Sequence, residues 1–541
     1  MSGNKIIVKM KDIPIKLPNE TLIDYSEMLA NWYVERTTPV YRKKRGQFFT
    51  PGIISDFMVR QFEDIDKKNE IRILDAGAGV GIFESAFCEY LLSLNKKMKV
   101  LFTLYENDRN LIFLLKKNME ACKAVMNGLG FDISYRIINE DFILSNALSY
   151  KKTKNNNYHA QNRYDLILSN PPYYKLHKNL PQAVKIRDIF NGQLNIYTIF
   201  MTLSAKLLKH NGQMTVITPR SYCSGYYFKQ FRKWFFSTVK PLKIHIFNSR
   251  EDVFKKYNVL QEIVILNAIK SQAIPRKILV SISNGIVNKY EELKTIHTTY
   301  DKIIVKRGDD LIMRIPTSEL DELVATQIDK YDTNLTPPYF KVSTGRVVPF
   351  RARDYLLNEK VIDNHHAPLI WMHNIVNDEI IWPNKMYNKP IAIEINEKTK
   401  KLLVPKGNYV LIKRFSTKEG KKRISAAVLL EKSLNAEQIG IENHVNYIYK
   451  VNGKLTKDEA YGIAALLNSK IYNLYFQMEN GSTQVNATEI NKLPFPSIEK
   501  IRKIGSLVRR EKGDNEIRIE KLVAKQLDID NKIIKELIGE K

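Results

Sequence analysis

Residues 71–81 read Ile-Arg-Ile-Leu-Asp-Ala-Gly-Ala-Gly-Val-Gly, and a largely apolar stretch of helix length, Ile82–Leu94, follows directly. The apolar residues before the acid predict a buried strand, and the glycines permit a tight turn in which backbone can approach a ligand closely. The helix that follows would present unpaired N–H groups to that ligand. This stretch therefore predicts the first strand, loop and helix of a nucleotide-binding α/β sheet.

Apolar runs of strand length recur over residues 71–270, separated by stretches of helix length. This alternation is typical of a parallel sheet with helices on both faces. The last two runs are joined by a polar connection, residues 248–261, with no room for a long helix, so we expect them to pair antiparallel. The predicted fold class is a Rossmann-like α/β sheet of seven strands: Ile71–Leu74, Val100–Tyr105, Ile133–Ile138, Tyr164–Leu168, Met214–Thr218, Ile244–Phe247 and Glu262–Ile269.

The regions on either side of the sheet differ from it in pattern. Residues 1–45 predict an N-terminal extension with a helix over Thr21–Val34, and the sheet domain is expected to occupy residues 46–285. Residues 286–500 show short β-rich stretches broken by Gly, Pro and Asn, which predict a second, mixed α/β domain. Residues 501–541, rich in Lys, Glu and Ile at helical spacing, predict a charged tail of surface helices.

The composition favours a polyanionic partner. The chain of 541 residues has 85 Lys and Arg against 58 Asp and Glu, a formal net charge of +27. Charge alone leaves nucleic acid and anionic membrane as alternatives. The sequence has neither a membrane-length apolar run nor a signal peptide, so we expect a cytoplasmic protein without membrane contact. Its three cysteines lie far apart, so neither a disulfide framework nor a metal site is expected.

Acidic residues are expected at the ends of three successive strands. Asp75 would repel a pyrophosphate but attract the ammonium and sulfonium groups of S-adenosylmethionine. Glu106 could accept both ribose hydroxyls, and Asp141 could accept from an adenine amino group while Phe142 covers the adenine face. We therefore favour S-adenosylmethionine as cofactor, with NAD or a turn without ligand as alternatives. The predicted cofactor residues here are Asp75, Gly77, Gly79, Glu106, Asp141 and Phe142.

The run Ser169-Asn-Pro-Pro-Tyr-Tyr174 directly follows the fourth strand. Its prolines stiffen the turn and remove backbone donors, so the side-chain oxygen of Asn170 and the carbonyl of Pro171 can both face outward as acceptors. Tyr173 adds a flat ring beside them. This combination suits a planar group with an amino function, held with its nitrogen towards a methyl donor. A loop merely stiffened by proline is the alternative. The predicted catalytic residues are Asn170, Pro171, Pro172 and Tyr173.

These motifs and their order along the chain resemble those of the γ class of DNA adenine-N6 methyltransferases. Members of that class run from an N-terminal cofactor motif through a glycine loop and an NPPY motif to a C-terminal target-recognition domain. Residues 46–51, Gly-Gln-Phe-Phe-Thr-Pro, resemble the N-terminal motif. The resemblance implies that Phe48, Thr50 and Pro51 close over the methionine part of the cofactor, which Asn170 also contacts.

The run Ser221–Arg232 resembles the family motif whose aromatic residue stacks on a flipped base. The resemblance places this role on Phe228, with Tyr226 and Tyr227 as rivals, so that Tyr173 and Phe228 would hold the base between them. An adenine inside a duplex hides its amino nitrogen, so chemistry on that nitrogen requires extrusion of the nucleotide. The implied reaction is methyl transfer from S-adenosylmethionine to N6 of a flipped adenine in double-stranded DNA.

The resemblance also implies a restriction-modification setting in a prokaryotic cytoplasm, with a separate restriction endonuclease as a further partner. Combined restriction and modification polypeptides of the family carry a nuclease domain before the N-terminal motif, but only 45 residues precede Gly46 here. Methylation without cleavage is therefore expected. Two alternatives stay open: a methyltransferase for RNA or protein glutamine, and a DNA-specificity subunit without catalysis.

Sequence-specific contacts are expected from the second domain, because the motifs for methyl transfer occupy the first. Its most basic stretch, Lys401–Arg423, holds eight Lys and Arg and one Glu, with polar and aromatic residues between them. That mixture suits contacts to phosphates, although a solvated basic face is the alternative. The predicted DNA-binding residues are Lys413, Arg414, Lys421, Lys422 and Arg423.

Overall fold

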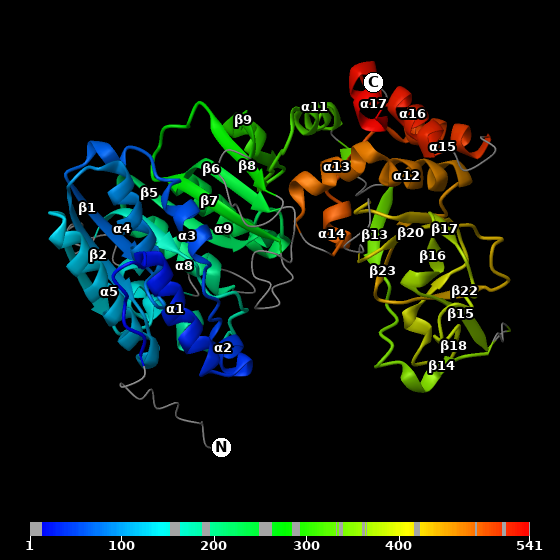
Figure 1. Ribbon diagram of the computed structural model, residues 1–541. Coiled ribbons are helices and arrows are strands. Elements are labelled where there is room, and N and C mark those ends of the chain that lie inside the picture. The colour runs from blue at the N-terminus through cyan, green and yellow to red at the C-terminus, as the bar shows by residue number, and fades with distance from the viewer. Residues whose placement is uncertain are drawn as a thin grey trace. The chain divides into compact units, whose positions relative to one another are not determined.

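The computed structural model describes residues 13–151, 163–186, 195–247, 262–283, 293–331, 333–334, 339–359, 363, 365–415, 422–481, 484–510 and 516–539. The chain forms two compact units, Met1–Thr317 and Ser318–Lys541 (Figure 1). Each unit has its own hydrophobic core and is described separately below.

A nine-stranded sheet runs through the first unit (Figure 1). Its strands are β1 (Glu70–Asp75), β2 (Lys99–Tyr105), β3 (Asp132–Ile138), β4 (Tyr164–Ser169), β5 (Leu208–Pro219), β6 (Lys240–Phe247), β7 (Ile263–Ile269), β8 (Ile278–Ser283) and β9 (Lys294–Thr298). Their spatial order is β3-β2-β1-β4-β5-β7-β6-β8-β9. The neighbours from β3 to β5 are parallel, and β7 is antiparallel to both β5 and β6. The seven predicted strands and the antiparallel pairing of the last two are confirmed.

Two strands beyond the predicted seven extend the sheet, because β8 pairs parallel with β6 and β9 pairs antiparallel with β8. A short hairpin follows, formed by β10 (Ile304–Arg307) and β11 (Asp310–Met313). Residues 286–317, which the sequence assigned to the second domain, therefore belong to the first unit. The boundary between the units lies after Thr317 rather than at residue 285. The reason is that β8 and β9 pair with the sheet beyond the last strand that the sequence pattern predicted.

Helices cover both faces of this sheet, as the alternating pattern predicted. Ile71 and Ile73 pack into one core, which α3 (Gly52–Val59) and α4 (Ile82–Leu94) help to form. Leu74 packs into the other core, on the opposite face of the same strand. The remaining helices of this unit are α1 (Leu22–Glu35), α2 (Pro39–Arg45), α5 (Arg109–Gly128), α6 (Phe142–Lys151), α7 (Pro181–Ile186), α8 (Ile196–Leu207), α9 (Lys229–Thr238) and α10 (Tyr300–Ile303).

The second unit combines two small sheets with a group of helices. One sheet has the order β13-β23-β20-β21, with bounds Phe340–Thr344, Val445–Lys450, Tyr409–Lys413 and Ala426–Leu429. The other has the order β14-β18-β15-β22-β19, with bounds Leu356–Leu357, Ala392–Glu394, His366–Ile370, Gln438–Ile441 and Leu403–Pro405. Short pairs join β12 (Thr333–Asn334) to β24 (Pro494–Phe495) and β16 (Ile375–Val376) to β17 (Glu379–Ile380). This architecture matches the mixed α/β composition expected after the first domain.

The C-terminal helices of the second unit do more than cover its surface. The helices are α11 (Glu319–Ile328), α12 (Lys457–Asn468), α13 (Lys470–Glu479), α14 (Ala487–Ile490), α15 (Ile498–Arg510), α16 (Glu516–Gln526) and α17 (Asn531–Ile538). A Cβ on Gly505 of α15 would lie 1.8 Å from the carbonyl oxygen of Asp458, so α12 and α15 touch backbone to backbone. Ile504, Val523 and Leu527 are buried in the core. The helical tail predicted from residue 501 is therefore packed into the unit.

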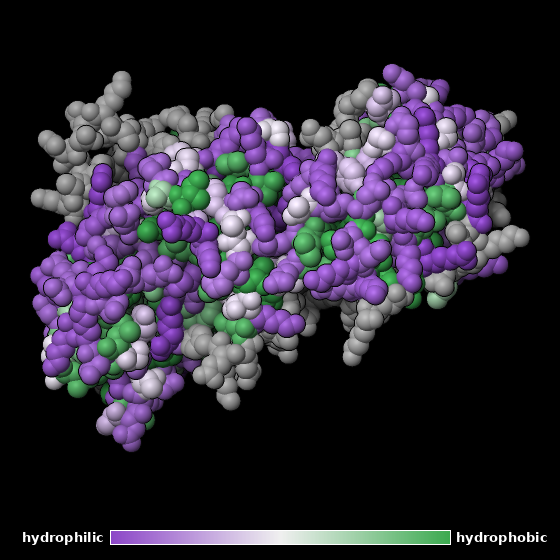
Figure 2. All heavy atoms as spheres, turned by 90° about the horizontal axis from the view of Figure 1, so that it is seen from above, coloured by the Kyte–Doolittle hydropathy of each residue, from purple (hydrophilic) through white to green (hydrophobic). Residues whose placement is uncertain are grey.

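The face of the molecule drawn in Figure 2 is covered mostly by hydrophilic side chains, with smaller hydrophobic groups between them. Among the helices that the structure describes, none combines the length and the apolar character needed to cross a bilayer. Cys88, Cys122 and Cys223 are all buried free thiols, as expected for packing residues.

The buried ion pair between Arg232 of α9 and Asp310 of β11 gives a test of the longer first unit. The guanidinium is fully buried and donates to both oxygens of Asp310 at 2.8 and 2.7 Å. Removing one partner of a buried pair leaves an uncompensated charge, so Asp310→Ala should lower the free energy of unfolding by about 3–5 kcal/mol. Urea unfolding of the full chain measures this loss.

The neighbouring Asp309 provides the matched control, because its side chain is 78% exposed and pairs with Lys229 at the surface. Asp309→Ala should leave the urea midpoint almost unchanged, since exposed pairs contribute little. Equal losses in the two variants would contradict the assignment of β11 to the core of the first unit.

Candidate active site

The predicted site residues gather at the carboxyl ends of four neighbouring parallel strands. Asp75 is the last residue of β1, Glu106 directly follows β2, Asp141 lies just after β3, and Asn170 directly follows β4. Since β3, β2, β1 and β4 are adjacent in that order, these side chains lie along one edge of the sheet. This is the edge at which open α/β sheets bind ligands.

The Asp75 carboxylate lies beneath the glycine loop and is fully buried. Its Oδ1 accepts from the backbone N–H of Gly77 at 2.9 Å, whereas Oδ2 has no hydrogen-bond partner among the described residues. Burial raises the pKa of Asp75. Glu84, in the first turn of α4, is also buried, and burial followed by repulsion from Asp75 raises its pKa well above the usual value. The loop therefore encloses acidic groups that lack a compensating cation in the described part of the chain.

Glu106 braces the glycine loop from the next strand. Its Oε2 accepts from the N–H of Gly79 at 3.0 Å and its Oε1 accepts from the N–H of Asp108 at 2.8 Å. Burial is the main reason that the pKa of Glu106 is raised, to about 7. The Glu106 carboxylate thus changes its charge near neutral pH while it supports the loop beside it.

Asp141 and Phe142 make contacts within the protein, whereas the sequence predicted that both face the cofactor. Asp141 accepts from the N–H of Leu144 at 2.9 Å and from the side chain of Gln182 at 2.8 Å, so both of its oxygens have partners in the protein. The Phe142 ring is buried, with its centroid 5.0 Å from that of Phe200. Phe200 in turn lies 3.9 Å from the position of a Cβ on Gly77, which makes it a wall of the site that spacing alone did not identify.

Asn170 is held by the segment that contains residues 46–51. Its Nδ2 donates to the carbonyl oxygen of Phe48 and to Oγ1 of Thr50, both at 2.9 Å. Gly46 packs directly on the proline loop, because a Cβ there would lie 2.6 Å from Cβ of Pro172. The structure therefore brings together two predicted motifs that are more than 100 residues apart, and it fixes the orientation of the Asn170 amide.

The aromatic residues of the site form a chain of rings. The Tyr173 hydroxyl lies 2.7 Å from Oδ1 of Asn170 and 3.0 Å from the carbonyl oxygen of Ile217, and its single proton can be donated to either acceptor. The Tyr173 ring meets Tyr197 edge-on at 6.5 Å, and Tyr197 lies 5.9 Å from Phe228. Phe228 is only 8% exposed, so Tyr197 contacts both residues that were expected to hold a base. The rivals Tyr226 and Tyr227 are 60% and 64% exposed.

Asp108 is a residue of this edge that the sequence reasoning missed. Its Oδ2 accepts from the hydroxyls of Tyr33 and Tyr41 at 2.9 and 3.1 Å and from Nε2 of Gln47 at 2.9 Å. Side-chain and backbone hydrogen bonds lower its pKa despite the opposing effect of burial. Asp108 therefore fastens α1, α2 and the start of the 46–51 segment to the end of β2. The acid directly before a helix was a visible capping signal, but its distant partners were not.

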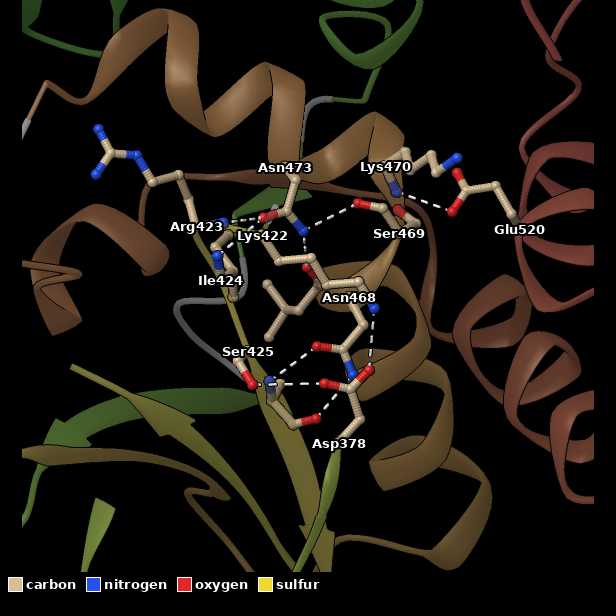
Figure 3. Close-up of polar contacts among 12 residues, drawn as sticks. Asp378, Lys422, Arg423, Ile424, Ser425, Asn468, Ser469, Lys470, Asn473 and Glu520 are labelled. Carbon is tan, nitrogen blue, oxygen red and sulfur yellow. Dashed lines mark hydrogen bonds and ion pairs between the residues drawn. The ribbon is translucent and has the colours of Figure 1, made fainter. Parts of the chain in front are cut away.

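The predicted DNA-binding stretch has many contacts inside the second unit (Figure 3). Nζ of Lys422 lies 3.1 Å from Asp378, and the main-chain N–H of Arg423 donates to the side chain of Asn473 at 2.7 Å. Burial lowers the pKa of Lys413. Nη1 of Arg414 donates to the carbonyl of Asn443 at 3.1 Å. Lys421 lies outside the described residues. The charged groups of Lys422 and Arg414, and the main chain of Arg423, thus help to hold the unit together.

Comparison with known proteins places this site in a defined class. Residues 86–254 match the Eco57I restriction-modification methylase family. The chain is 34% identical over 499 residues to the type II methyltransferase M.PstI of Providencia stuartii, covering 92% of this chain and 94% of the relative. It is 33% identical to the type II methyltransferase M.BsuBI of Bacillus subtilis, covering 90% and 93%.

One solved structure supports the same fold over almost the whole chain. It is the type IIL restriction-modification enzyme MmeI in complex with DNA, with a TM-score of 0.55 and 12% identity over 91% of this chain and 72% of that one. The fold and the relatives together define a methyltransferase of the restriction-modification type. The chain belongs to the family of type II methyltransferases that includes M.PstI and M.BsuBI.

The Asp108 contacts predict a role in positioning the 46–51 segment. Asp108→Ala removes the acceptor shared by Tyr33, Tyr41 and Gln47, so the segment should be held less firmly over the glycine loop. We expect the affinity for S-adenosylmethionine to fall about tenfold or more, the equivalent of about 1.4 kcal/mol, because hydrogen bonds to a charged acceptor contribute about that much each. Isothermal titration calorimetry with the full chain measures the change.

Asp165 offers a matched control, since it is also a buried acid of the sheet but lies at the start of β4, where it accepts from Lys209 at 2.8 Å. Asp165→Asn should leave cofactor affinity close to that of the wild type. Tyr33→Phe should cause a smaller loss than Asp108→Ala, since it removes one donor only. An unchanged affinity in Asp108→Ala would refute the positioning role.

Proposed function

We propose that the chain is an adenine-specific DNA methyltransferase, which transfers a methyl group from S-adenosylmethionine to N6 of an adenine extruded from duplex DNA. One observation carries this proposal: the Asn170 loop lies beside the acidic, glycine-lined end of β1 and is hydrogen-bonded to the 46–51 segment. A planar amino group bound at Asn170 would therefore lie next to the cofactor. Membership of the type II methyltransferase family supports the same reaction.

The residues around the glycine loop fit a cationic cofactor. The buried Oδ2 of Asp75 has no partner in the described part of the chain, and an ammonium group would compensate it. Glu106 offers further acceptor capacity to ribose hydroxyls, and Phe48, Thr50 and Pro51 would close over the methionine part. When bound, S-adenosylmethionine supplies the electrophilic methyl group. The acidic lining explains a preference for this cofactor over a dinucleotide.

Asn170 would recognise the amino group through an acceptor of fixed direction. Because Nδ2 already donates to Phe48 and Thr50, the amide cannot flip without losing both hydrogen bonds. Oδ1 can accept from Tyr173 and still retains capacity for one further donor. We infer that the target N6–H donates to this oxygen and a second N–H donates to the carbonyl of Pro171. Both contacts would favour a pyramidal nitrogen, whose lone pair could attack the methyl carbon as the carbon–sulfur bond breaks. The neutral thioether S-adenosylhomocysteine would leave, and the methylated nitrogen would then lose one proton to solvent.

The base would stack on Tyr173, a half-buried residue beside Asn170 whose ring also lies 6.0 Å from that of Phe48. The family resemblance assigns the opposite face to Phe228. Accessibility favours the exposed Tyr226 or Tyr227 for a base that arrives from outside, since Phe228 is largely covered. A separate restriction endonuclease that cuts the unmethylated site would complete the system. The complex of MmeI with DNA, which shares this fold, supports DNA as the partner.

A methyl-transfer assay tests the proposed substrate directly. The purified full chain is incubated with radiolabelled S-adenosylmethionine and with duplex DNA, RNA or a protein fraction. We expect label in duplex DNA, as N6-methyladenine at one sequence motif that long-read sequencing identifies. Label only in RNA or protein would overturn the proposal, and tight DNA binding without any methyladenine would favour a non-catalytic specificity subunit.

Asn170→Ala should lower kcat by about 10²–10³, because it removes a preorganised acceptor for the target amino group. The affinity for S-adenosylmethionine should change by less than about tenfold, since the acids of the glycine loop stay in place. Single-turnover methylation and calorimetry separate the two effects. Asn127→Ala, at the far end of α5, is the control and should behave as the wild type. Parallel losses of turnover and affinity in Asn170→Ala would contradict its assignment to the base.

The affinity for S-adenosylmethionine should rise as pH rises from about 5.5 to about 7.5. This pH range lies below the usual pKa of an α-amino group, so the amino group of the cofactor stays mainly cationic throughout. In the free protein the raised pKa of Glu106, about 7, and the raised pKa of Asp75 favour protonated carboxyls at the acidic end of this range. A cationic ligand favours the ionised forms, so binding releases protons. Calorimetry in buffers of different ionisation enthalpy measures this release. An affinity and proton count independent of pH would refute the assignment of these acids to the cofactor.

A further inference from the structure

Three rings of the second unit form a stack that ends at the surface. The Trp371 and His373 rings lie 6.0 Å apart with an interplanar angle of 18°, and the His373 and Tyr387 rings lie 4.4 Å apart with an angle of 25°. Trp371 is buried, whereas Tyr387 is 50% exposed. The stack therefore runs from the core of the unit outwards and presents Tyr387 as its outer member. We call Trp371, His373 and Tyr387 the ring stack.

The protein holds the ring stack firmly from several directions. Nε1 of Trp371 donates to the carbonyl of Pro390 at 2.6 Å. The side chain of Asn384 donates to the carbonyl of His373 at 3.0 Å and is itself buried. Nε1 of Trp382 donates to the carbonyls of Leu369 and Ile391, both at 3.2 Å. These bonds tie the chain after Trp382 to strand β15, so Tyr387 is presented by a supported loop.

The surroundings of the ring stack are apolar and basic. Met386, next to Tyr387, is 88% exposed. Nζ of Lys389 lies 5.6 Å from the centre of the Trp371 ring, and Lys385 is exposed on the same short loop. Burial, followed by repulsion from Lys389, lowers the pKa of His373, so its ring is neutral and free to stack at neutral pH. Tyr387 thus offers an exposed ring on a loop that also carries the exposed Lys385 and Lys389, which suits a flat group with a neighbouring negative charge.

A second aromatic group adjoins the same part of the unit. The N–H of Glu442 donates to the carbonyl of Ile370 at 3.0 Å, immediately before Trp371. Nδ1 of His444 lies 2.7 Å from Oε1 of Glu442, and the His444 ring lies 5.1 Å from that of Phe415. The predicted basic stretch thus meets this region through Phe415, while Lys422 is engaged by Asp378 (Figure 3). The contacts described around Glu442 thus include the aromatic pair of Phe415 and His444, whereas the charge of Lys422 is engaged by an acid.

We propose that Tyr387, at the outer end of the ring stack, makes a stacking contact with a nucleobase of the DNA substrate, and that Lys385 and Lys389 bind the adjoining phosphates. The inference rests on the proposed function, and it names a contact in the second unit that is separate from methyl transfer. The contact requires a nucleotide that is unstacked from the duplex, because stacked neighbours cover the faces of paired bases. On such a nucleotide, aromatic stacking tolerates any base, since every base has a π-face, and lysines bind phosphate as point charges. Tyr387 thus contributes affinity for DNA rather than the choice of sequence.

Substitution of Tyr387 tests the contact in the full chain. Binding is measured to a duplex that carries the motif found by sequencing, with S-adenosylmethionine present and at a stated salt concentration. Tyr387→Ala should weaken binding about tenfold or more, whereas Tyr387→Phe, which keeps the ring, should stay within about threefold of the wild type. Tyr339→Ala is the matched control, because Tyr339 is 53% exposed on the same unit, and it should change binding little.

A second measurement does not depend on any variant. Duplexes with 5-iodouracil at successive positions are irradiated with the wild-type protein, and the crosslinked peptide is identified by mass spectrometry. We expect at least one position to crosslink to Tyr387. Wild-type affinity in Tyr387→Ala, an equal loss in Tyr387→Phe, or crosslinks confined to other peptides would overturn the inference.

The outcomes also separate this inference from the proposed function. A wild-type protein that neither binds nor methylates duplex DNA would refute the proposed function itself. A wild-type protein that methylates DNA, beside a Tyr387→Ala variant that binds DNA equally well, would refute only the role of Tyr387. Urea unfolding of each variant verifies that the second unit is folded, and calorimetry with S-adenosylmethionine verifies that the site in the first unit is unaffected.

Discussion

In the proposed reaction, the orientation of one side-chain amide would govern the chemistry of the site. The Nδ2 group of Asn170 is committed to Phe48 and Thr50, and its Oδ1 therefore points away from them, towards Tyr173. An asparagine without these partners could present either its donor or its acceptor to a ligand. The two hydrogen bonds make it an acceptor, which is the property that recognition of an amino group requires. The segment that supplies them is in turn held by Gln47, through Asp108.

The first unit combines this rigid acceptor with a destabilised acidic pocket. Asp75, Glu84 and Glu106 have raised pKa values chiefly because burial disfavours their charged forms. Such burial opposes the stability of the unligated protein at neutral pH, since the ionised groups lack compensation. Under the proposed function a cationic cofactor would relieve the same penalty, and this relief would contribute to selectivity for S-adenosylmethionine.

In the second unit, part of the predicted DNA-binding stretch also makes contacts within the protein, and its role in DNA binding stays a prediction. The basic stretch stood out by composition, yet Lys422 is paired with Asp378, and the backbone of Arg423 is bound by Asn473. The ring stack had no comparable signal, because Trp371, His373 and Tyr387 lie close in sequence but at no recognisable period. They come together only because β15 and the following loops fold back on one another.

Local pattern alone was enough to identify the seven central strands, the glycine loop and the acids and Asn170 at the strand ends. These features depend on alternation and on motifs that lie within a few residues of one another, and parallel strands bring their carboxyl ends to a common edge. The added strands β8 and β9, the Asp108 contacts and the partners of the basic residues were decided by tertiary structure. Tyr33 and Asp108 are 75 residues apart, and Thr50 and Asn170 are 120 apart. Contacts over such separations depend on how whole elements pack, which no local pattern specifies.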